Sequence, residues 1–278
     1  KSCLLFIIKS KIMNEKNFEY LRDQLKFTGF GEGLEAELKQ KLQEQPPTFF
    51  LNHNTQYGND TVSTTLQFSR SKQTDMYFFN SYQVNLQKEK VSESMTQTFY
   101  INKGNNITLK EAYNLMSGRA VNKDLTSKEG QLYNTWLQMD FKESDDKGNF
   151  KLKQYHQNYG YDLESAIAKL PIKELAQDEH KGMLIDSLKK GNLQSVTFQK
   201  EGQELKQYIE ANPQFKTINV YNSSMQRLDN RQVKTENIGD RESQSVKQAV
   251  KKERQGAGEE DGPRLPQEKK KRKRQSLS

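Results

Sequence analysis

The chain has 278 residues, of which 29% are charged and 32% hydrophobic, and its formal net charge is +8. This length is enough for one or two domains with a sizeable core, whereas the low apolar fraction indicates that a long segment stays outside any core. The single cysteine, Cys3, excludes an intrachain disulfide and fits a reducing cytoplasm. The histidines His53, His156 and His180 are far apart, and no Cys/His spacing is typical of a zinc site.

The N-terminal segment contains one short apolar run, Cys3–Ile8. Six residues are too few for the core of a signal peptide or for a membrane span. Met13 is followed by a sequence typical of the start of a folded chain, so we expect residues 1–12 to be translated upstream sequence rather than a membrane anchor. We therefore predict that residues 1–12 are dispensable and not part of the fold.

Two helices are predicted next. Asn14 is placed to cap a helix over Glu15–Lys26, and a second helix covers Leu34–Gln43 before a pair of prolines. Between them, Thr28–Gly33 is rich in glycine but lacks the Lys-Ser/Thr of a phosphate-binding loop. We interpret it as a turn between helices.

A β-rich region follows, with turn residues at the spacing of an antiparallel meander. The predicted strands are Phe49–His53, Thr61–Arg70, Asp75–Gln87 and Ser94–Lys103. The aromatic run Met76–Phe79 has two interpretations, a ligand-stacking platform or the core of a strand. Strand core is favoured, because aromatic residues commonly fill sheet faces.

The clearest helix signal is a capping box formed by Thr108 and Glu111. It predicts a helix over Leu109–Met116 that stops at Gly118. In the strand that follows, the only tryptophan, Trp136, falls on the more polar face. It either packs against a second surface or is an exposed contact, and burial is slightly favoured.

The rest of the folded region alternates helices and strands. The predicted strands are Arg119–Lys123, Leu132–Phe141, Asn149–Tyr159, Gln194–Lys200, Glu204–Glu210 and Lys216–Tyr221. The predicted helices are Leu163–Lys169, capped by Asp162, and a helix that Asp178 caps and that runs to Lys190, with Met183, Leu184 and Leu188 facing inward. Asp145 and Asp146 offer a metal-binding pair, but an exposed turn is the better interpretation, because no third ligand is nearby.

These elements predict an α+β fold with an N-terminal helical pair, an antiparallel β-meander, a second helix–strand module and a disordered basic C-terminal tail. The predicted divisions are 1–12, the segment before the fold; 13–107, the helical pair and first sheet; 108–228, the second α+β module; and 229–278, the tail.

Several short runs resemble one family. Leu115–Val121 and Gln138–Asp140, with Asn158–Asp162 and Ile209–Phe215, are similar to segments of an uncharacterised domain-of-unknown-function family carried by conjugative transposons and other mobile elements of Bacteroidetes. The resemblance covers residues 14–228 and includes no catalytic motif. It implies a genetic context, in the company of relaxase, topoisomerase-like or primase-like proteins, and not an activity.

The C-terminal tail holds the strongest functional signal. Residues 229–278 contain 14 Lys/Arg and 9 Asp/Glu, so the rest of the chain carries only +3 of the total charge. Apolar periodicity vanishes there, which predicts disorder. Six consecutive basic residues are the candidate nucleic-acid-binding site: Lys269, Lys270, Lys271, Arg272, Lys273 and Arg274. Such a run attracts phosphates without sequence preference, although a merely solubilising tail is the alternative.

No arrangement typical of an enzyme stands out. The best catalytic candidates, Asp140, His156 and Glu164, are a scatter of the kind any chain of this length offers. We therefore expect a non-enzymatic cytoplasmic accessory protein of a mobile element that binds DNA or RNA through its tail, with no cofactor, metal or membrane. The alternatives are a module that docks onto DNA-processing proteins and a cryptic metal-dependent nuclease. If the folded part binds nucleic acid instead, Tyr77, Phe79 and Trp136 are the candidate stacking residues.

Overall fold

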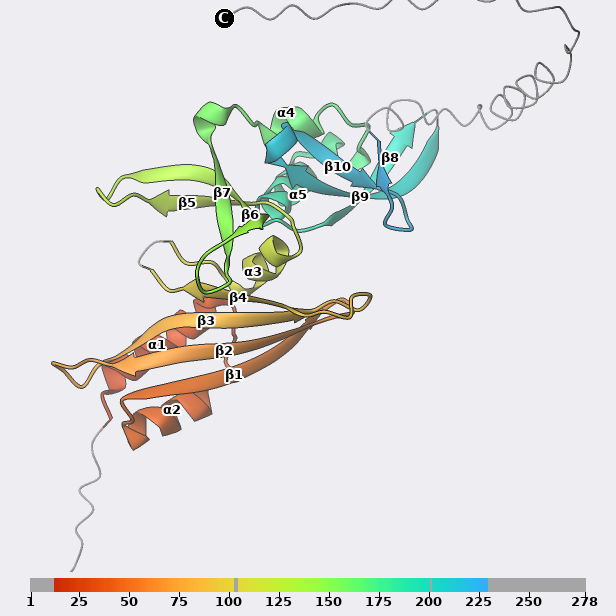
Figure 1. Ribbon diagram of the computed structural model, residues 1–278. Coiled ribbons are helices and arrows are strands. Elements are labelled where there is room, and N and C mark those ends of the chain that lie inside the picture. The colour runs from red at the N-terminus through yellow and green to blue at the C-terminus, as the bar shows by residue number, and fades with distance from the viewer. Residues whose placement is uncertain (1–12, 103–104, 201, 230–278) are drawn as a thin grey trace, which may run out of the picture. The chain divides into compact units, whose positions relative to one another are not determined.

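The computed structural model describes residues 13–102, 105–200 and 202–229, which lie within one compact unit ending at Asn230 (Figure 1). The helices are α1 (Glu15–Thr28), α2 (Glu35–Glu44), α3 (Leu109–Met116), α4 (Leu163–Ile167) and α5 (Asp178–Lys189), with short 3-10 turns at Gln157–Tyr159, Lys173–Ala176 and Pro213–Phe215. The strands are β1 (Thr48–Tyr57), β2 (Asp60–Arg70), β3 (Tyr77–Gln87), β4 (Met95–Tyr100), β5 (Val121–Thr126), β6 (Leu132–Ser144), β7 (Phe150–His156), β8 (Gln194–Lys200), β9 (Gln203–Asn212), β10 (Thr217–Tyr221) and β11 (Arg227–Leu228).

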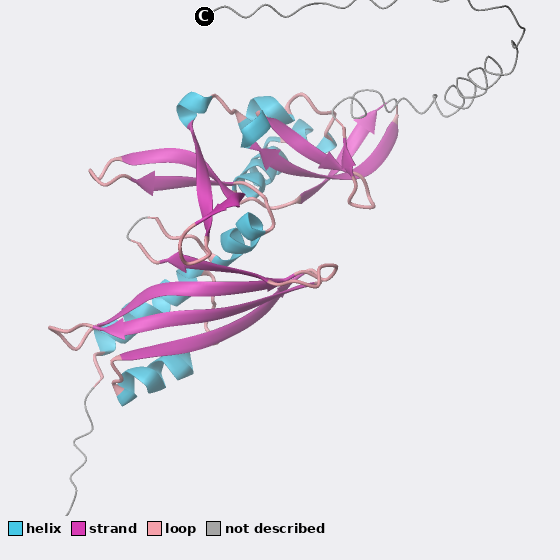
Figure 2. Cartoon of the chain, viewed as in Figure 1, coloured by secondary structure: helices cyan, strands magenta, loops and turns pink. Residues whose placement is uncertain are grey.

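The fold is α+β, as predicted, and its strands form three antiparallel sheets (Figure 2). The first sheet has the order β1-β2-β3-β4, the second β5-β6-β7 and the third β11-β10-β9-β8. Every sheet is a meander of sequential neighbours, which short polar turns can connect.

The N-terminal helices form where their caps predict. Asn14 accepts a hydrogen bond from the Asn17 backbone, and Gly29 ends α1 with φ +98°, a conformation that glycine adopts without strain. The glycine-rich turn after α1 therefore joins two helices, as predicted. Asn17 then fixes α1 to the first sheet, because its amide accepts from the backbone N–H of Tyr77 at 2.7 Å and donates to the Tyr77 carbonyl at 3.0 Å.

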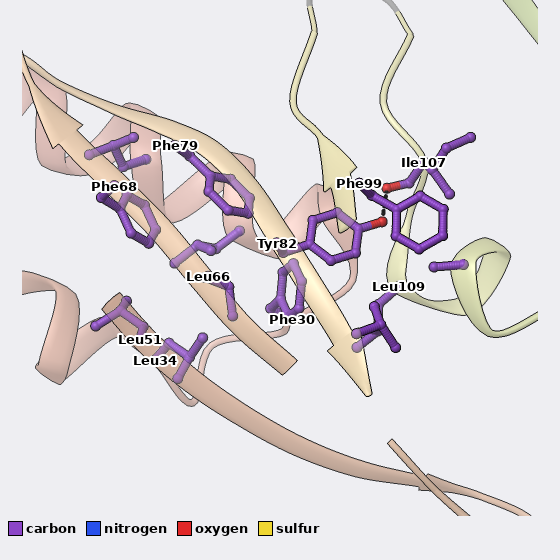
Figure 3. Packing of buried hydrophobic residues seen from close by; sticks show 14 of the residues in the cluster. Phe30, Leu34, Leu51, Leu66, Phe68, Phe79, Tyr82, Phe99, Ile107 and Leu109 are labelled. Carbon is purple, nitrogen blue, oxygen red and sulfur yellow. Dashed lines mark hydrogen bonds between the residues drawn. The ribbon is translucent and has the colours of Figure 1, made fainter. Parts of the chain in front are cut away.

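Both helices cover the same face of the first sheet (Figure 1). Phe68 and Phe79 stack with their ring centroids 4.9 Å apart, and Phe30, from the turn between the helices, contacts Tyr82 edge-on at 5.3 Å (Figure 3). The Tyr82 hydroxyl, fully buried, donates a hydrogen bond to the Ile107 carbonyl (Figure 3). Buried phenols need such a partner. This bond ties the sheet to the segment that leads into α3.

The core continues beyond the first sheet. Leu115 and Met116 of α3 and Leu137 and Met139 of β6 belong to the same cluster of buried side chains as the first sheet's aromatic residues. One core therefore spans the predicted division between residues 107 and 108.

The capping box at the start of α3 is confirmed. Glu111 donates its backbone N–H to the Thr108 hydroxyl, and its carboxylate accepts from the Thr108 backbone N–H at 2.8 Å. The same carboxylate accepts from Lys123 of β5 at 2.7 Å, with both side chains largely buried. Glu111 therefore joins the start of α3 to β5.

A buried asparagine closes the other end of α3. Asn114 is fully buried; its amide donates to the Lys190 carbonyl at 2.7 Å and to the Asn192 side-chain oxygen at 3.0 Å. Its oxygen accepts from the Arg119 guanidinium, which also donates to the Gly191 carbonyl at 3.0 Å. This network joins α3 to the segment before β5 and to the turn after α5.

Trp136 is buried, with 6% of its surface exposed, and its ring meets Tyr161 edge-on at 5.3 Å. The neighbouring Leu137 and Met139 point to the opposite face of β6, into the first core. The central strand of the second sheet therefore has two covered faces, and the predicted burial of Trp136 is confirmed.

Two expectations for α5 are wrong. Its N-cap is Gln177, with no side-chain hydrogen bond, and Asp178 is the first helical residue. Met183 is 64% exposed, while Ile185 is buried beside Leu184 and Leu188. The buried stripe follows positions i, i+1 and i+4, so its centre lies one position later than the sequence pattern indicates.

Candidate functional site

The predicted nucleic-acid-binding residues, Lys269–Arg274, lie outside the residues that the structure describes. So do residues 1–12 and the tail from residue 230 onward. The candidate site on the folded part is therefore built from the described residues alone.

The three residues predicted to stack on bases are buried. Tyr77 and Phe79 are 3% and 4% exposed and point toward the helices, and Trp136 is buried in the second sheet. A ring that is packed inside a core offers no face to a ligand. This prediction is wrong because side chains alternate between the two faces of a strand, so the exposed aromatic residue of this run is its neighbour Phe78.

The face of the first sheet opposite α1 and α2 carries no charged side chain. We call this surface the neutral face, and its eighteen residues are Thr48, Phe50, Asn52, Asn54, Gln56, Thr61, Ser63, Thr65, Gln67, Ser69, Phe78, Asn80, Gln83, Asn85, Gln87, Thr96, Thr98 and Tyr100. An ordinary protein surface of eighteen residues contains about five charges. Amides, hydroxyls and aromatic rings therefore dominate this surface.

The three aromatic residues of the neutral face are Phe50, Phe78 and Tyr100, which are 53%, 48% and 48% exposed. Strand pairing places Phe50 opposite Gln67, and Tyr100 at the far end of the same cross-strand row. Three strand spacings separate them, about 14 Å. Phe78 lies toward the end of the sheet, opposite Ser69. The three rings thus lie toward one end of the face and span its width from β1 to β4.

Hydrogen bonds between strands order the polar groups of the neutral face. The Thr65 hydroxyl donates to the Asn52 side chain at 3.1 Å, and the Asn85 amide donates to the Thr96 hydroxyl at 3.1 Å. Such pairs limit side-chain motion in the free protein, so less side-chain entropy is lost when a ligand binds.

The hairpin between β6 and β7 reaches the edge of this face. Asn149 accepts a hydrogen bond from the Thr98 backbone at 2.8 Å, which protects the open edge of β4. Lys147, on the same turn, places its ammonium nitrogen 3.3 Å from the Tyr100 hydroxyl and 5.7 Å from the ring centroid. A cation therefore stands next to one of the three rings.

The Asp145–Asp146 pair belongs to this turn, and it is exposed. Asp145 accepts hydrogen bonds from the Asn149 side chain and from the backbone of Asn149 and Lys147, which lower the pKa of its carboxyl. Asp145 therefore shapes the turn, and both side chains are exposed there.

A groove of about 1320 Å³ lies beside the end of β3. Its exposed aromatic lining comes from Tyr20 and Phe27 of α1 and from Phe78, so it borders the neutral face. Its polar lining includes Glu111 and Lys123, which are already paired with each other. Its lining also holds Asp23, Asp124, Asp186, Lys189 and Lys190, so the groove adds charged groups beside the aromatic end of the neutral face.

A cationic cluster lies at the turn between β1 and β2. The Lys110 ammonium is 4.0 Å from the ring centroid of Tyr57 and 4.8 Å from that of Tyr113, and Arg119 stacks on Tyr113. Burial lowers the pKa of Lys110, and the nearby Arg119 lowers it further. Burial also raises the pKa of Tyr113, whose hydroxyl donates to Asp60 at 3.0 Å. These contacts fasten α3 to the first sheet.

The catalytic candidates have separate partners. Asp140 pairs with Lys153 at 2.6 Å, and Glu164 pairs with Lys181. His156 lies against the Tyr133 ring at 5.5 Å. Within residues 13–102, 105–200 and 202–229, no three His, Cys, Asp or Glu side chains gather as a metal ion would require.

One sequence signal could have located the neutral face. Four predicted strands carry uncharged polar residues at every second position, in a chain that is 29% charged. Within any single strand, this pattern is the ordinary alternation of polar and apolar residues. Only the register of the strands shows that these residues share one surface.

Comparison with known proteins returns no relative: no protein-family model matches the chain, and neither a curated protein nor a solved structure is similar to it. Among the helices of the described residues, none has the length and apolar character needed to cross a membrane.

Proposed function

We propose that this protein binds nucleic acid without sequence preference, through the basic run Lys269–Arg274. The observation that carries the proposal is the concentration of charge: six adjacent cations stand in a tail of net +5, while residues 1–228 carry only +3. Phosphate contacts from such a run supply affinity but no base information.

We also propose a genetic context and a cellular location for the protein. The resemblance of Leu115–Val121 and Gln138–Asp140 to proteins of mobile elements supports a role as a non-enzymatic accessory protein of such an element. The single cysteine supports a cytoplasmic location. DNA-processing proteins of the element are the partners that this setting implies.

Gel shifts at several salt concentrations test the proposal. Six phosphate contacts predict that log affinity for duplex DNA falls with log salt at a slope of at most about −5. A variant in which Lys269–Arg274 are all replaced by Gln should lose most binding at moderate salt, with unchanged thermal melting. The control replaces six uncharged tail residues, 243–246 and 248–249, by Gly. Equal binding by the wild type and the six-Gln variant would refute the proposal.

A further inference from the structure

We infer that the neutral face binds single-stranded nucleic acid by stacking unpaired bases on Phe50, Phe78 and Tyr100. The inference rests on the proposed function, because the basic tail supplies most of the attraction for phosphate. It adds a site on the folded part and a preference for unpaired strands, neither of which the tail provides.

The shape and chemistry of the surface suit unpaired bases. Two helices cover one side of the four antiparallel strands (Figure 1). The other side presents three aromatic rings, each about half exposed. Bases stack on such rings whatever their identity, because every base has a π-face. A four-stranded sheet with exposed aromatic residues is a general solution for holding two or three unpaired bases.

The lack of charge on the surface also suits bases. Base edges are neutral and carry hydrogen-bond donors and acceptors, which match amides and hydroxyls such as those of Asn52, Gln67 and Asn80. A carboxylate repels phosphates, and none of the eighteen residues of the neutral face carries one. At its borders, Asp145 beside Tyr100 lies near Lys147, and Asp23 beside Phe78 is paired with Arg22.

A neutral sugar would also suit aromatic rings and amides, but the cations of this chain favour nucleic acid. The Lys147 ammonium stands 3.3 Å from the Tyr100 hydroxyl, where it can contact a phosphate that follows a base on this ring. A neutral sugar chain has no phosphate that Lys147 or the six basic residues of the tail could bind. The charge complementarity of the whole chain therefore favours nucleic acid.

A duplex does not fit this site. Its bases are stacked on one another, so their faces are unavailable to protein rings unless the pair opens. The tail should therefore bind both forms, whereas the neutral face should bind only single strands.

The test measures the fluorescence anisotropy of a labelled thymidine oligonucleotide of about 12 residues and of a duplex of the same length, at about 0.3 M salt. The full chain is compared with the combined variant Phe50→Thr, Phe78→Thr and Tyr100→Thr. Threonine suits exposed strands, so this variant should keep its fold. Its matched control, Leu132→Thr with Phe215→Thr, removes other exposed apolar side chains, which are 78% and 67% exposed.

We expect the triple variant to bind the single strand at least tenfold more weakly and the duplex as before. The control should bind both as the wild type does. A triple variant that binds the single strand normally overturns the inference, while the six-Gln variant of the tail reports separately on the proposed function.

A second pair of variants changes charge without touching the rings. Thr65 lies in the middle of the neutral face and is exposed. Thr65→Lys should strengthen binding of the single strand and Thr65→Glu should weaken it. Equal effects of the two substitutions overturn the inference, as does binding of cellohexaose that is lost in the triple variant.

Discussion

The buried Asn114 should be the most sensitive polar position of the described fold. In Asn114→Ala, the Lys190 carbonyl and the Asn192 side chain each lose a donor, at about 1 kcal/mol per neutral bond. The Arg119 guanidinium loses its acceptor, at about 1.5–3 kcal/mol for a charged bond, and keeps only the Gly191 carbonyl. The free energy of unfolding should therefore fall by about 3–5 kcal/mol.

Urea denaturation followed by far-ultraviolet circular dichroism measures this change. The control is Asn52→Ala, which removes one hydrogen bond at the exposed neutral face and should cost less than about 0.5 kcal/mol. Combining Asn114→Ala with Arg119→Ala should cost less than the sum of the two single changes, by at least about 1 kcal/mol, because the residues share bonds. A loss below about 1 kcal/mol for Asn114→Ala, or strict additivity, would show that the network does not join these elements.

Three further substitutions test the packing of the fold and its stability at low pH. Trp136→Ala should lower the free energy of unfolding by about 3–5 kcal/mol, and iodide should quench the native fluorescence only weakly. Gly191→Ala should cost about 3 kcal/mol or more, because a Cβ at φ +77° would lie 2.8 Å from the Ala120 carbonyl oxygen. Hydrogen bonds from Lys153 and the backbone lower the pKa of Asp140, so its stabilisation is present above the unfolded pKa and lost as pH falls below it. Melting of Asp140→Asn between about pH 5 and pH 2 should therefore be less acid-sensitive than that of the wild type.

Local signals predicted most of the secondary structure. The side chain of Asn14 and the capping box at Thr108 mark helix starts through bonds between residues that are close in sequence, so their geometry can be read directly. β8 begins and ends at the predicted residues, because turn residues flank it in the sequence. The two-residue strand β11 was missed because it is too short to show alternation.

Local signals could not predict which side chains of a strand face solvent. Whether Tyr77 or Phe78 faces the helices depends on which face of the sheet the helices cover, and a strand with aromatic residues on both faces does not specify this. Trp136 presents the same difficulty, because both faces of β6 are covered. Phe79 is buried, so its favoured assignment to the strand core is correct, and its alternative role as a stacking ring is wrong.

The residues that carry the family resemblance have structural partners. Gly118 takes φ +86° at the end of α3, and Arg119 bonds to Asn114 and Gly191. In β6, Gln138 donates to the Gly118 carbonyl at 3.1 Å, and the neighbouring Asp140 pairs with Lys153. These contacts hold α3, β6 and the segments beside them together, so the motif residues have structural roles here, and a fold does not by itself specify a site. The function of this chain therefore has to be tested on the neutral face and the tail, whereas substitutions in this motif test its fold.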